Sequence, residues 1–294
     1  MSNGHYTELS DRAVLRLTGA DTRSFLQGLV TADVDHLSET QALYAGLLTP
    51  QGKILFDFFL AQSGEEIFID CAKPQAADLT KRLTFYKLRA AVEIADVSEE
   101  RTVVAIWGGD VPGDTSDAVC YADPRFSQAG TRLLVAAGEI EAIASQLGLA
   151  QAGEAAYHAH RIALGLADSV RDIGSGEHFP HECNFDQIGG VDFKKGCYVG
   201  QEVVSRTEHR GTARKRMVPL HFDGAAPAPG TEITGNGKAV GEVLSTAGTL
   251  ALGLIRLDRA QSALDADGAL TAGDEAVHLD KPEWARFDLP GAAE

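Results

Sequence analysis

Cysteine is scarce in this sequence, and its spacing excludes several classes of protein. No two cysteines form a Cys-x-x-Cys pair. Disulfide-held secreted domains carry cysteine more densely, and zinc or iron–sulfur sites need closely spaced ligands. His178, His181 and Cys183 could ligate a metal, but no fourth ligand is evident, so an ordinary loop is the better interpretation. We expect no metal site formed by this chain alone. The four cysteines are Cys71, Cys120, Cys183 and Cys197.

Long apolar runs are also missing. No stretch approaches the ~18 apolar residues that a membrane-spanning helix needs. Residues 1–12 are polar and lack the apolar segment of a signal peptide. We therefore expect a soluble, cytoplasmic protein that does not contact membranes.

Positive charge is in short supply, because the net charge is −16. General nucleic-acid binding needs a basic footprint, so this class is excluded. Residues 194–216 are an exception, with seven lysines and arginines against two glutamates. Such a basic strip suggests an anionic ligand or an acidic partner, although the solvated face of a strand or hairpin would explain it equally well.

The order of predicted elements indicates an α+β fold. A chain of 294 residues is long enough for two or three packed units. Strands and helices alternate irregularly, which does not suit a regular parallel sheet. No glycine-rich phosphate loop follows a strand, so a dinucleotide fold has no support. We predict strands at residues 13–17, 54–60, 67–70, 103–107 and 132–136, and helices beginning at Pro74 and near Ile140, the second capped by Gly148.

The pattern changes after Arg216. Short strands separated by glycine are typical of a small barrel. A Pro/Ala/Gly-rich loop at residues 223–230 interrupts them. We place the domain boundary near Gly211, which gives a first region of residues 1–210 and a second of residues 211–294. The predicted strands of the second region are residues 218–222, 239–244, 250–257 and 276–279.

The densest group of chemically able side chains lies at residues 194–202. Gly196 and Gly200 bracket Cys197 and Tyr198, and glycine allows a sharp turn and the close approach of a ligand. A neighbouring lysine favours the thiolate of a cysteine, and a tyrosine can stack on a flat ring. The alternative is a tight turn around a buried structural cysteine.

Residues 195–202, which read K-G-C-Y-V-G-Q-E, resemble the K-G-C-[YF]-x-G-Q-E signature of the YgfZ/Iba57 (CAF17-like) folate-binding family. That family is related to the glycine-cleavage T-protein, an aminomethyltransferase. The resemblance covers most of the first region, although the shorter matches are individually weak. These further matches are residues 15–34, 47–54, 86–89, 123–125, 161–162 and 180–182.

The resemblance implies two α+β subdomains and a C-terminal small β-barrel around a central channel that binds tetrahydrofolate. It also implies a role in iron–sulfur cluster assembly or repair, with iron–sulfur proteins or cluster-assembly factors as partners. Cys197 would be the reactive side chain, and Lys195 would tune it. Independently of the resemblance, we expect a monomer, because no long unpaired apolar face stands out in the sequence. The expected folate-binding residues are Tyr198, Gly200, Gln201, Glu202, Arg206, Arg125 and Glu182.

One departure weakens the likeness to the T-protein, whose R-[LI]-E-x-G block places a glutamate on the pterin. The matching residue here is Ala163, which has no carboxylate. Asp57 and Glu182 are possible substitutes, but Asp57 lies between two phenylalanines, and we interpret it as the solvent face of a strand. Two alternatives stay open: a folate-dependent aminomethyl or one-carbon transferase, and a cysteine-nucleophile enzyme that does not use folate.

Overall fold

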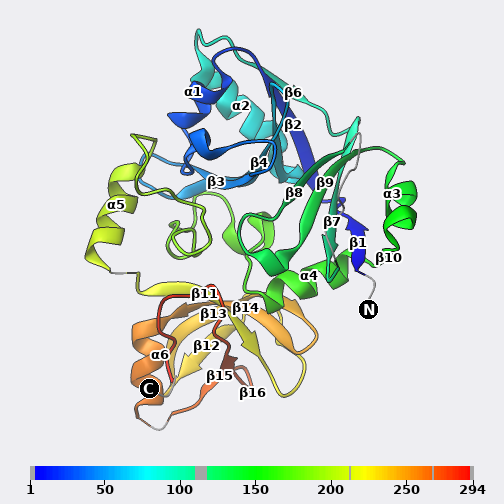
Figure 1. Cartoon of the computed structure of the whole chain (residues 1–294). Helices are drawn as coiled ribbons and strands as arrows, with labels where there is room; N and C mark the ends of the chain where they lie inside the picture. The colour runs from blue at the N-terminus through cyan, green and yellow to red at the C-terminus, as the bar shows by residue number, and fades with distance from the viewer. Residues whose placement is uncertain (1–3, 110–117, 212, 267, 292–294) are drawn as a thin grey trace.

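The computed structural model describes residues 4–109, 118–211, 213–266 and 268–291. Three sheets organise the described residues: two sheets of five strands and one of seven. In Figure 1 the two smaller sheets form the upper part of the molecule, and the largest sheet lies below them. The α+β prediction is confirmed. None of the helices in the described ranges is long and apolar enough to cross a membrane.

The first five-stranded sheet carries helices α1 (Thr22–Gln27) and α2 (Ala76–Lys87). The predicted hairpin is present, with β4 and β5 paired in antiparallel fashion. Pro74 does not begin α2 as predicted; it lies in a 3-10 turn, Lys73–Gln75, that precedes the helix. The strands of this sheet run in the order β3 (Leu43–Leu48), β4 (Ile54–Ser63), β5 (Glu66–Ala72), β2 (Arg12–Thr18) and β6 (Glu93–Asp96).

The second five-stranded sheet interleaves with the first along the chain. The first strand of the protein lies next to the central strand of this sheet, so the chain visits this sheet before it builds the other. Helices α3 (Ile140–Leu147) and α4 (Glu154–Ala163) follow it, and Gly148 ends α3 in the left-handed conformation, as predicted. The strand order is β10 (Ala150–Gln151), β1 (His5–Glu8), β7 (Arg101–Trp107), β9 (Thr131–Ala136) and β8 (Val119–Ala122).

The seven-stranded sheet curls into a nearly closed barrel, so the barrel prediction is confirmed. The predicted strand at residues 250–257 is one residue shorter, because Leu257 begins helix α6 (Leu257–Leu264). The division into domains at Gly211 remains a prediction. The barrel strands are β11 (Lys215–His221), β12 (Glu232–Gly235), β13 (Lys238–Ala247), β14 (Leu250–Arg256), β15 (Leu270–Ala272), β16 (Glu275–Ala276) and β17 (His278–Leu279).

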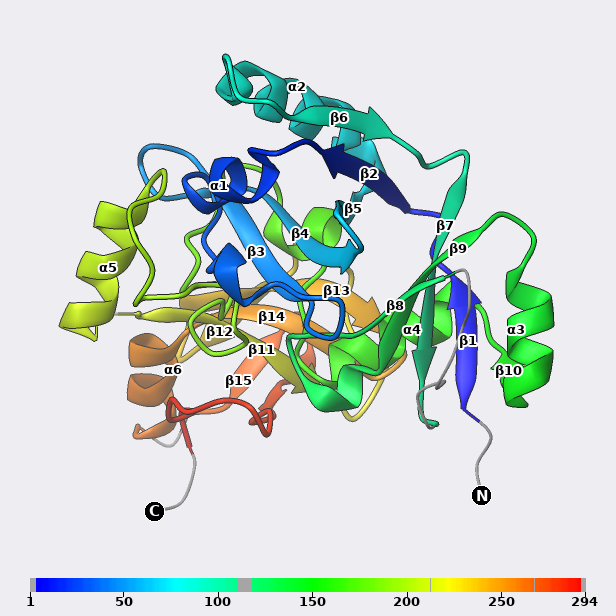
Figure 2. The same cartoon turned by 45° about the horizontal axis from the view of Figure 1, so that its top comes forward.

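A long connection joins α4 to the barrel. It contains a π-helical turn, Ser169–Ile173, then an irregular segment, and it ends in helix α5 (Gln201–Arg210). Figure 2 shows α5 standing at the edge of the molecule, next to the start of the barrel. Two further 3-10 turns lie at Val34–His36 and Ser127–Ala129.

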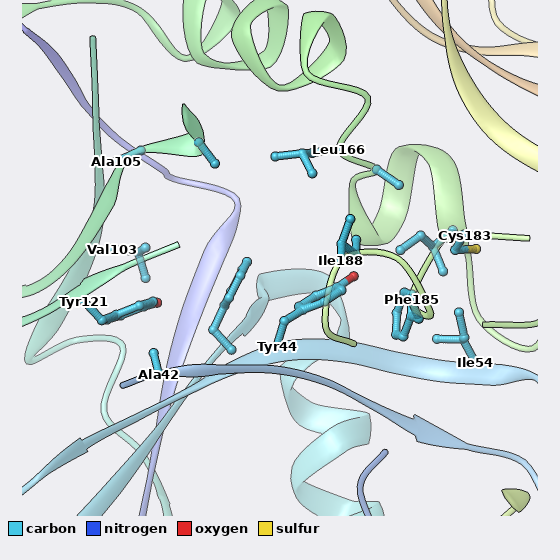
Figure 3. Packing of buried hydrophobic residues seen from close by; sticks show 14 of the residues in the cluster. Ala42, Tyr44, Ile54, Val103, Ala105, Tyr121, Leu166, Cys183, Phe185 and Ile188 are labelled. Carbon is cyan, nitrogen blue, oxygen red and sulfur yellow. The ribbon is translucent and has the colours of Figure 1, made fainter. Parts of the chain in front are cut away.

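One large apolar cluster connects the three sheets. The cluster includes one residue from each sheet: Tyr44 of β3, Tyr121 of β8 and Leu252 of β14. Phe185 of the long connection packs against Tyr44 with ring centroids 4.8 Å apart, as Figure 3 shows. Burial of such aromatic rings dominates core energetics, so the irregular connection contributes to the core that the sheets share.

Candidate functional site

The loop at residues 194–200 is shaped by a glycine at its end. Gly200 has φ +82°, and a Cβ atom there would lie 2.5 Å from the carbonyl oxygen of Thr49. Only glycine satisfies both conditions without strain. Gly200 then serves as the N-cap residue of α5. The sequence block at residues 49–53 and the cysteine motif therefore contact each other directly.

Lys195 anchors the loop from below. Its side chain is only 7% exposed, and its ammonium donates to the carbonyl oxygens of Val30 and Ala32, each at 2.7 Å. Burial lowers the pKa of Lys195 to about 8, although Asp33 and Asp192 act in the opposite direction. The ammonium is therefore engaged by main-chain carbonyls, and its predicted influence on Cys197 stays a prediction.

Asp192 fixes the beginning of the same loop. Its Oδ1 accepts the backbone amides of Lys194 at 2.7 Å and Lys195 at 3.2 Å. The Asp192 amide donates to the Thr31 carbonyl at 3.0 Å, and the Thr31 hydroxyl donates to the Gly190 carbonyl. These bonds attach the loop to residues 30–32, which follow α1.

Tyr198 is part of the core rather than a free stacking surface. Its ring is buried within the large apolar cluster, and the Lys195 ammonium lies 5.4 Å from the ring centroid. Burial raises the pKa of Tyr198 well above its ordinary value, and its hydroxyl has no hydrogen-bond partner among the described residues. A ligand would have to displace core contacts to stack on this ring, so its binding role stays a prediction.

Cys197 is the exposed cysteine of the chain. Cys71 and Cys183 are buried, and Cys120 is half-buried. Burial raises the pKa of Cys71 to about 12 and also raises that of Cys183, which keeps both as inert thiols. The alternative of a buried structural cysteine at position 197 is therefore wrong. The loop presents one accessible sulfur atom.

Of the remaining motif residues, Glu202 is exposed, whereas Val199 and Gln201 are half-buried. The Gln201 side chain donates to the Gly196 carbonyl at 3.4 Å. Glu202 and Arg206 form an exposed pair at 2.5 Å, one helical turn apart. Such a pair contributes little to stability. The basic strip is not a single face, because Lys195 and Arg216 are buried.

Arg125 and Glu182 do not share contacts with this loop. Arg125 is buried and forms a fork with Asp123, at 3.0 Å and 2.8 Å. Glu182 accepts the Phe179 amide at 2.9 Å and faces His178 at 3.8 Å. Burial alone would raise the pKa of Glu182, but these donors lower it. Both side chains are committed to local structure, and their predicted folate contacts remain untested.

Two groups in the described ranges have enough carboxylates and histidines to hold a cation. In the first, Asp33, His36 and Asp192 lie beside the buried ammonium of Lys195, whose charge opposes a cation. In the second, Asp186 of the set His181, Asp186 and Glu208 is already paired with the guanidinium of Arg216. Cys183 belongs to neither group.

A second cluster of charges fills the centre of the molecule, between the two smaller sheets. Asp70 accepts hydrogen bonds from Arg12 at 2.6 Å, Arg132 at 2.8 Å and the Tyr121 hydroxyl at 2.8 Å. Arg132 also covers the Phe59 ring, 4.1 Å from its centroid. Each guanidinium of this group has a carboxylate partner, as burial requires.

Arg161 connects this centre to the barrel. It belongs to the block that matches the R-[LI]-E-x-G block of the T-protein. Its guanidinium donates to Asp172 at 2.7 Å and to the Ser245 hydroxyl of β13 at 2.8 Å. The Ser245 hydroxyl in turn donates to Asp172. The role of Arg161 in the described structure is therefore to join α4 to the barrel.

Asp57 corrects a prediction. It is 4% exposed rather than on a solvent face, and the Tyr44 hydroxyl donates to it at 2.9 Å. Burial raises the pKa of Asp57, and nearby Arg12 only partly offsets that effect. The face of β4 that carries Asp57 is covered by the long connection and by the second sheet. The alternation of residues within the strand could not reveal this cover.

Asp57 lines a small cavity of about 20 Å³. The unpartnered Nε2 of His158 is buried beside it. The donors and acceptors suit a pterin, but sites for molecules of that size usually measure about 300–1,000 Å³, whereas this cavity has room for about one water. Tetrahydrofolate does not fit here in the described conformation. Other lining residues are Arg12, Phe59, Arg125, Arg132, Tyr157 and Arg161.

Sequence reasoning missed most of this central cluster. Its members are isolated charges inside apolar strands, such as Asp70 in β5 and Arg132 in β9. A charge that interrupts a buried strand needs a partner. The isolated charges in apolar strands could therefore have indicated a buried ion-pair cluster. The sequence does not show which of these charges form pairs, because partners such as Arg12 and Asp70 lie 58 positions apart.

Two family descriptions match parts of the chain. Residues 4–112 match "GCVT N-terminal domain", and residues 214–287 match "CAF17, C-terminal beta-barrel domain". Among solved structures, the aminomethyltransferase T of the glycine cleavage system from Bartonella henselae superposes with a TM-score of 0.77. The match covers 97% of this chain and 87% of the aminomethyltransferase, at 17% sequence identity. A similarity at this level of identity supports the fold alone.

Curated relatives are more similar in sequence. The iron–sulfur cluster assembly factor IBA57 homologue of Coccidioides immitis is 33% identical, across 87% of this chain and 72% of the relative. The human IBA57 protein is 30% identical, across 94% and 84%. Both are named as mitochondrial proteins. This finding overturns the cytoplasmic expectation and points to mitochondria.

Proposed function

The chain belongs to the IBA57 family of iron–sulfur cluster assembly factors, and we propose that it supports cluster assembly on partner proteins through the thiol of Cys197. The observation that carries the proposal is the exposure of Cys197 on a loop fixed by buried contacts. A thiolate is the usual protein ligand of cluster iron. The iron–sulfur cluster is the cargo in this proposal.

One accessible thiol determines how the protein would act. A cluster is normally held by four protein ligands, and the remaining cysteines of this chain are buried or half-buried. The other ligands would have to come from a partner. Cys197 would thus join a cluster that a second protein also holds, which suits transfer better than storage.

A Cys197→Ala variant tests the proposal. In cells that lack the native gene, we expect the variant to leave cluster-dependent enzymes as inactive as an empty plasmid does, with an unchanged melting temperature. Cys120→Ala is the matched control, because Cys120 is half-buried on β8, and it should restore activity fully. Full rescue by Cys197→Ala would overturn the proposal.

Tetrahydrofolate binding is a separate part of the proposal. Asp57 and the Nε2 of His158, which has no hydrogen-bond partner among the described residues and lies 3.7 Å from the Asp11 carboxylate, support it, but the cavity would have to open before a pterin could enter. Calorimetric titration of tetrahydrofolate into the wild-type protein and into Cys197→Ala separates the two parts. Equal binding by both proteins would support a folate site independent of the thiol, and no binding by either would end the folate proposal.

One observation keeps a one-carbon transferase as a second candidate. Asp57 is a buried carboxyl group with a raised pKa, placed at a cavity, and such groups serve as acids or bases in enzymes. Incubation with an aminomethyl donor and tetrahydrofolate should then yield methylene-tetrahydrofolate, and Asp57→Asn should abolish it. Absence of product from the wild-type protein would exclude this candidate.

A cysteine-nucleophile enzyme has less support. Such an enzyme needs a base within hydrogen-bond reach of its thiol. In the part of the chain that the structure describes, no hydrogen bond connects Cys197 to a histidine, and the sulfur faces solvent. We therefore do not extend the proposal to this class.

A further inference from the structure

The end of α2 exposes two large apolar side chains. Phe85 is 71% exposed and Leu88 is 85% exposed. They make up half of the four large apolar side chains that the described residues expose, and they lie within four positions of each other. Single exposed apolar side chains are ordinary, but a group of them usually marks an interaction site.

The backbone at Leu88 is strained. Its φ of +48° and ψ of −104° lie outside the regions that an L-residue normally occupies. Glycine or asparagine is the usual residue where a helix ends with positive φ. Because the Leu88 side chain lies in solvent, its packing does not offset the strain. Strained residues of this kind concentrate at binding and switch sites.

A surface hollow lies beside Phe85. It measures about 520 Å³, and its apolar wall includes Leu55 and Phe56 of β4. Lys81 and Arg82, one turn before Phe85 on α2, form a cationic rim. Asp78 and Ser175 complete the lining. The hollow has room for several side chains.

The charge around the hollow is opposite to that of the protein. Residues 73–91 contain five basic residues and one acidic residue, in a chain of net charge −16. Among the described residues, no ion pair engages the four cations nearest to the exposed side chains. They are free to meet carboxylates from another molecule. These four are Lys81, Arg82, Lys87 and Arg89.

We propose that this surface, the α2 patch formed by Phe85, Leu88 and these four cations, docks a partner protein. The partner would present carboxylates around a protruding apolar side chain that enters the hollow. Complementary charge selects such a partner and speeds its approach, while apolar anchors in a pocket supply the affinity. A second copy of the patch would repel the first, which argues against symmetric pairing through α2.

The α2 patch is distinct from the site of Cys197, and it does not depend on the proposed function. In Figures 1 and 2, α2 lies at the end of the molecule away from the barrel, while α5, which follows Cys197, stands at the side. A partner could therefore occupy the patch and leave the thiol loop open. Loss of docking and loss of the Cys197 activity can be measured separately.

Synthetic helical peptides test the proposal on the full-length protein. The probe is a 20-residue stapled peptide with leucine and phenylalanine on one face and glutamate on both flanks. One comparison peptide carries lysine in place of glutamate, and another carries serine in place of the apolar residues. By fluorescence anisotropy, we expect the probe to bind at least tenfold more tightly than either comparison peptide, and more weakly at high salt.

Variants assign that binding to the patch. Phe85→Ser with Leu88→Ser, and separately Lys81→Glu with Arg82→Glu, should each weaken probe binding tenfold or more without lowering the melting temperature. Phe193→Ser is the matched control, because Phe193 is also exposed but lies in the long connection. Unchanged binding by the patch variants would overturn the proposal. So would variant-sensitive binding to vesicles containing anionic phospholipid in the absence of peptide binding, since the patch would then contact membranes.

Leu88→Gly tests the strain directly. Glycine tolerates positive φ, so this variant should melt at a higher temperature than the wild-type protein while binding the probe peptide more weakly. This combination separates a docking role from a structural one. A lower melting temperature for Leu88→Gly would show that the Leu88 conformation serves folding, and the inference would fail.

Discussion

Replacement of Asp70 by asparagine should strongly destabilise the protein. Asp70 is the acceptor for two buried guanidinium groups, Arg12 at 2.6 Å and Arg132 at 2.8 Å, and for the Tyr121 hydroxyl. Asparagine keeps one acceptor oxygen but removes the negative charge that both cations need. Removing one partner of a buried pair typically costs about 3–5 kcal/mol. For a chain of this size, that corresponds to a fall of roughly 10 °C in melting temperature.

The measurement is chemical and thermal denaturation of Asp70→Asn beside a matched control. Glu66→Gln suits this purpose, because Glu66 pairs with Arg16 at 3.7 Å and both side chains are partly exposed. Exposed pairs contribute about 0–1 kcal/mol, so the control should change little. If Asp70→Asn were as stable as Glu66→Gln, the central charges would not act as a buried pair, and the reasoning would be refuted.

The pH dependence of Asp70 gives the same test a second readout. Burial alone would raise the pKa of Asp70, but Arg12 and Arg132 hold it below its usual range. A carboxyl group with a lowered pKa stabilises the folded state fully above its unfolded value of about 3.9. That contribution is lost as the pH falls through the folded value. The stability gap between wild type and Asp70→Asn should therefore be constant near pH 7 and narrow below about pH 4.

Three further outcomes follow from the thiol loop. Because burial lowers the pKa of Lys195 to about 8, the unfolded chain binds more protons between pH 8 and about 10.4, so wild-type stability should rise with pH there relative to Lys195→Met in urea denaturation. Gly200→Ala should lower the free energy of unfolding by about 1–2 kcal/mol or more, because Gly200 has a φ of +82° and the added Cβ atom would meet the Thr49 carbonyl. Gly196→Ala is the control and should melt like wild type, because a Cβ atom at Gly196 meets no atom within 4 Å. Tyr198→Phe should keep or slightly raise the melting temperature, because the lost hydroxyl has no described partner; a fall of several degrees would reveal a hidden hydrogen bond.

The elements that could be predicted are those set by local pattern. The hairpin of β4 and β5 follows from two apolar runs around a polar turn, and the end of α3 follows from Gly148. The barrel follows from short strands separated by glycine. Each of these depends on neighbours within a few positions, so the sequence states them directly.

Asp57 shows where such reasoning stops. In β4 it alternates with Phe56 and Phe58, and alternation alone assigns it to the face opposite theirs. Whether that face meets water depends on what covers it, and here Tyr44 and the second sheet do. Coverage is decided by segments far apart in the chain. The same limit applies to Asp70, whose partners come from three other strands.

The cysteine motif could be located from the sequence, but the structural role of each of its residues could not be predicted. Lys195 and Tyr198 look like reactive groups, yet both are buried and hold the loop in place. Gly200 is required by a close backbone contact rather than by a ligand. Of the three side chains Lys195, Cys197 and Tyr198, only Cys197 is exposed. Much of this motif is therefore used to hold one sulfur atom in a fixed position, as the proposed contact with a cluster on another protein would require.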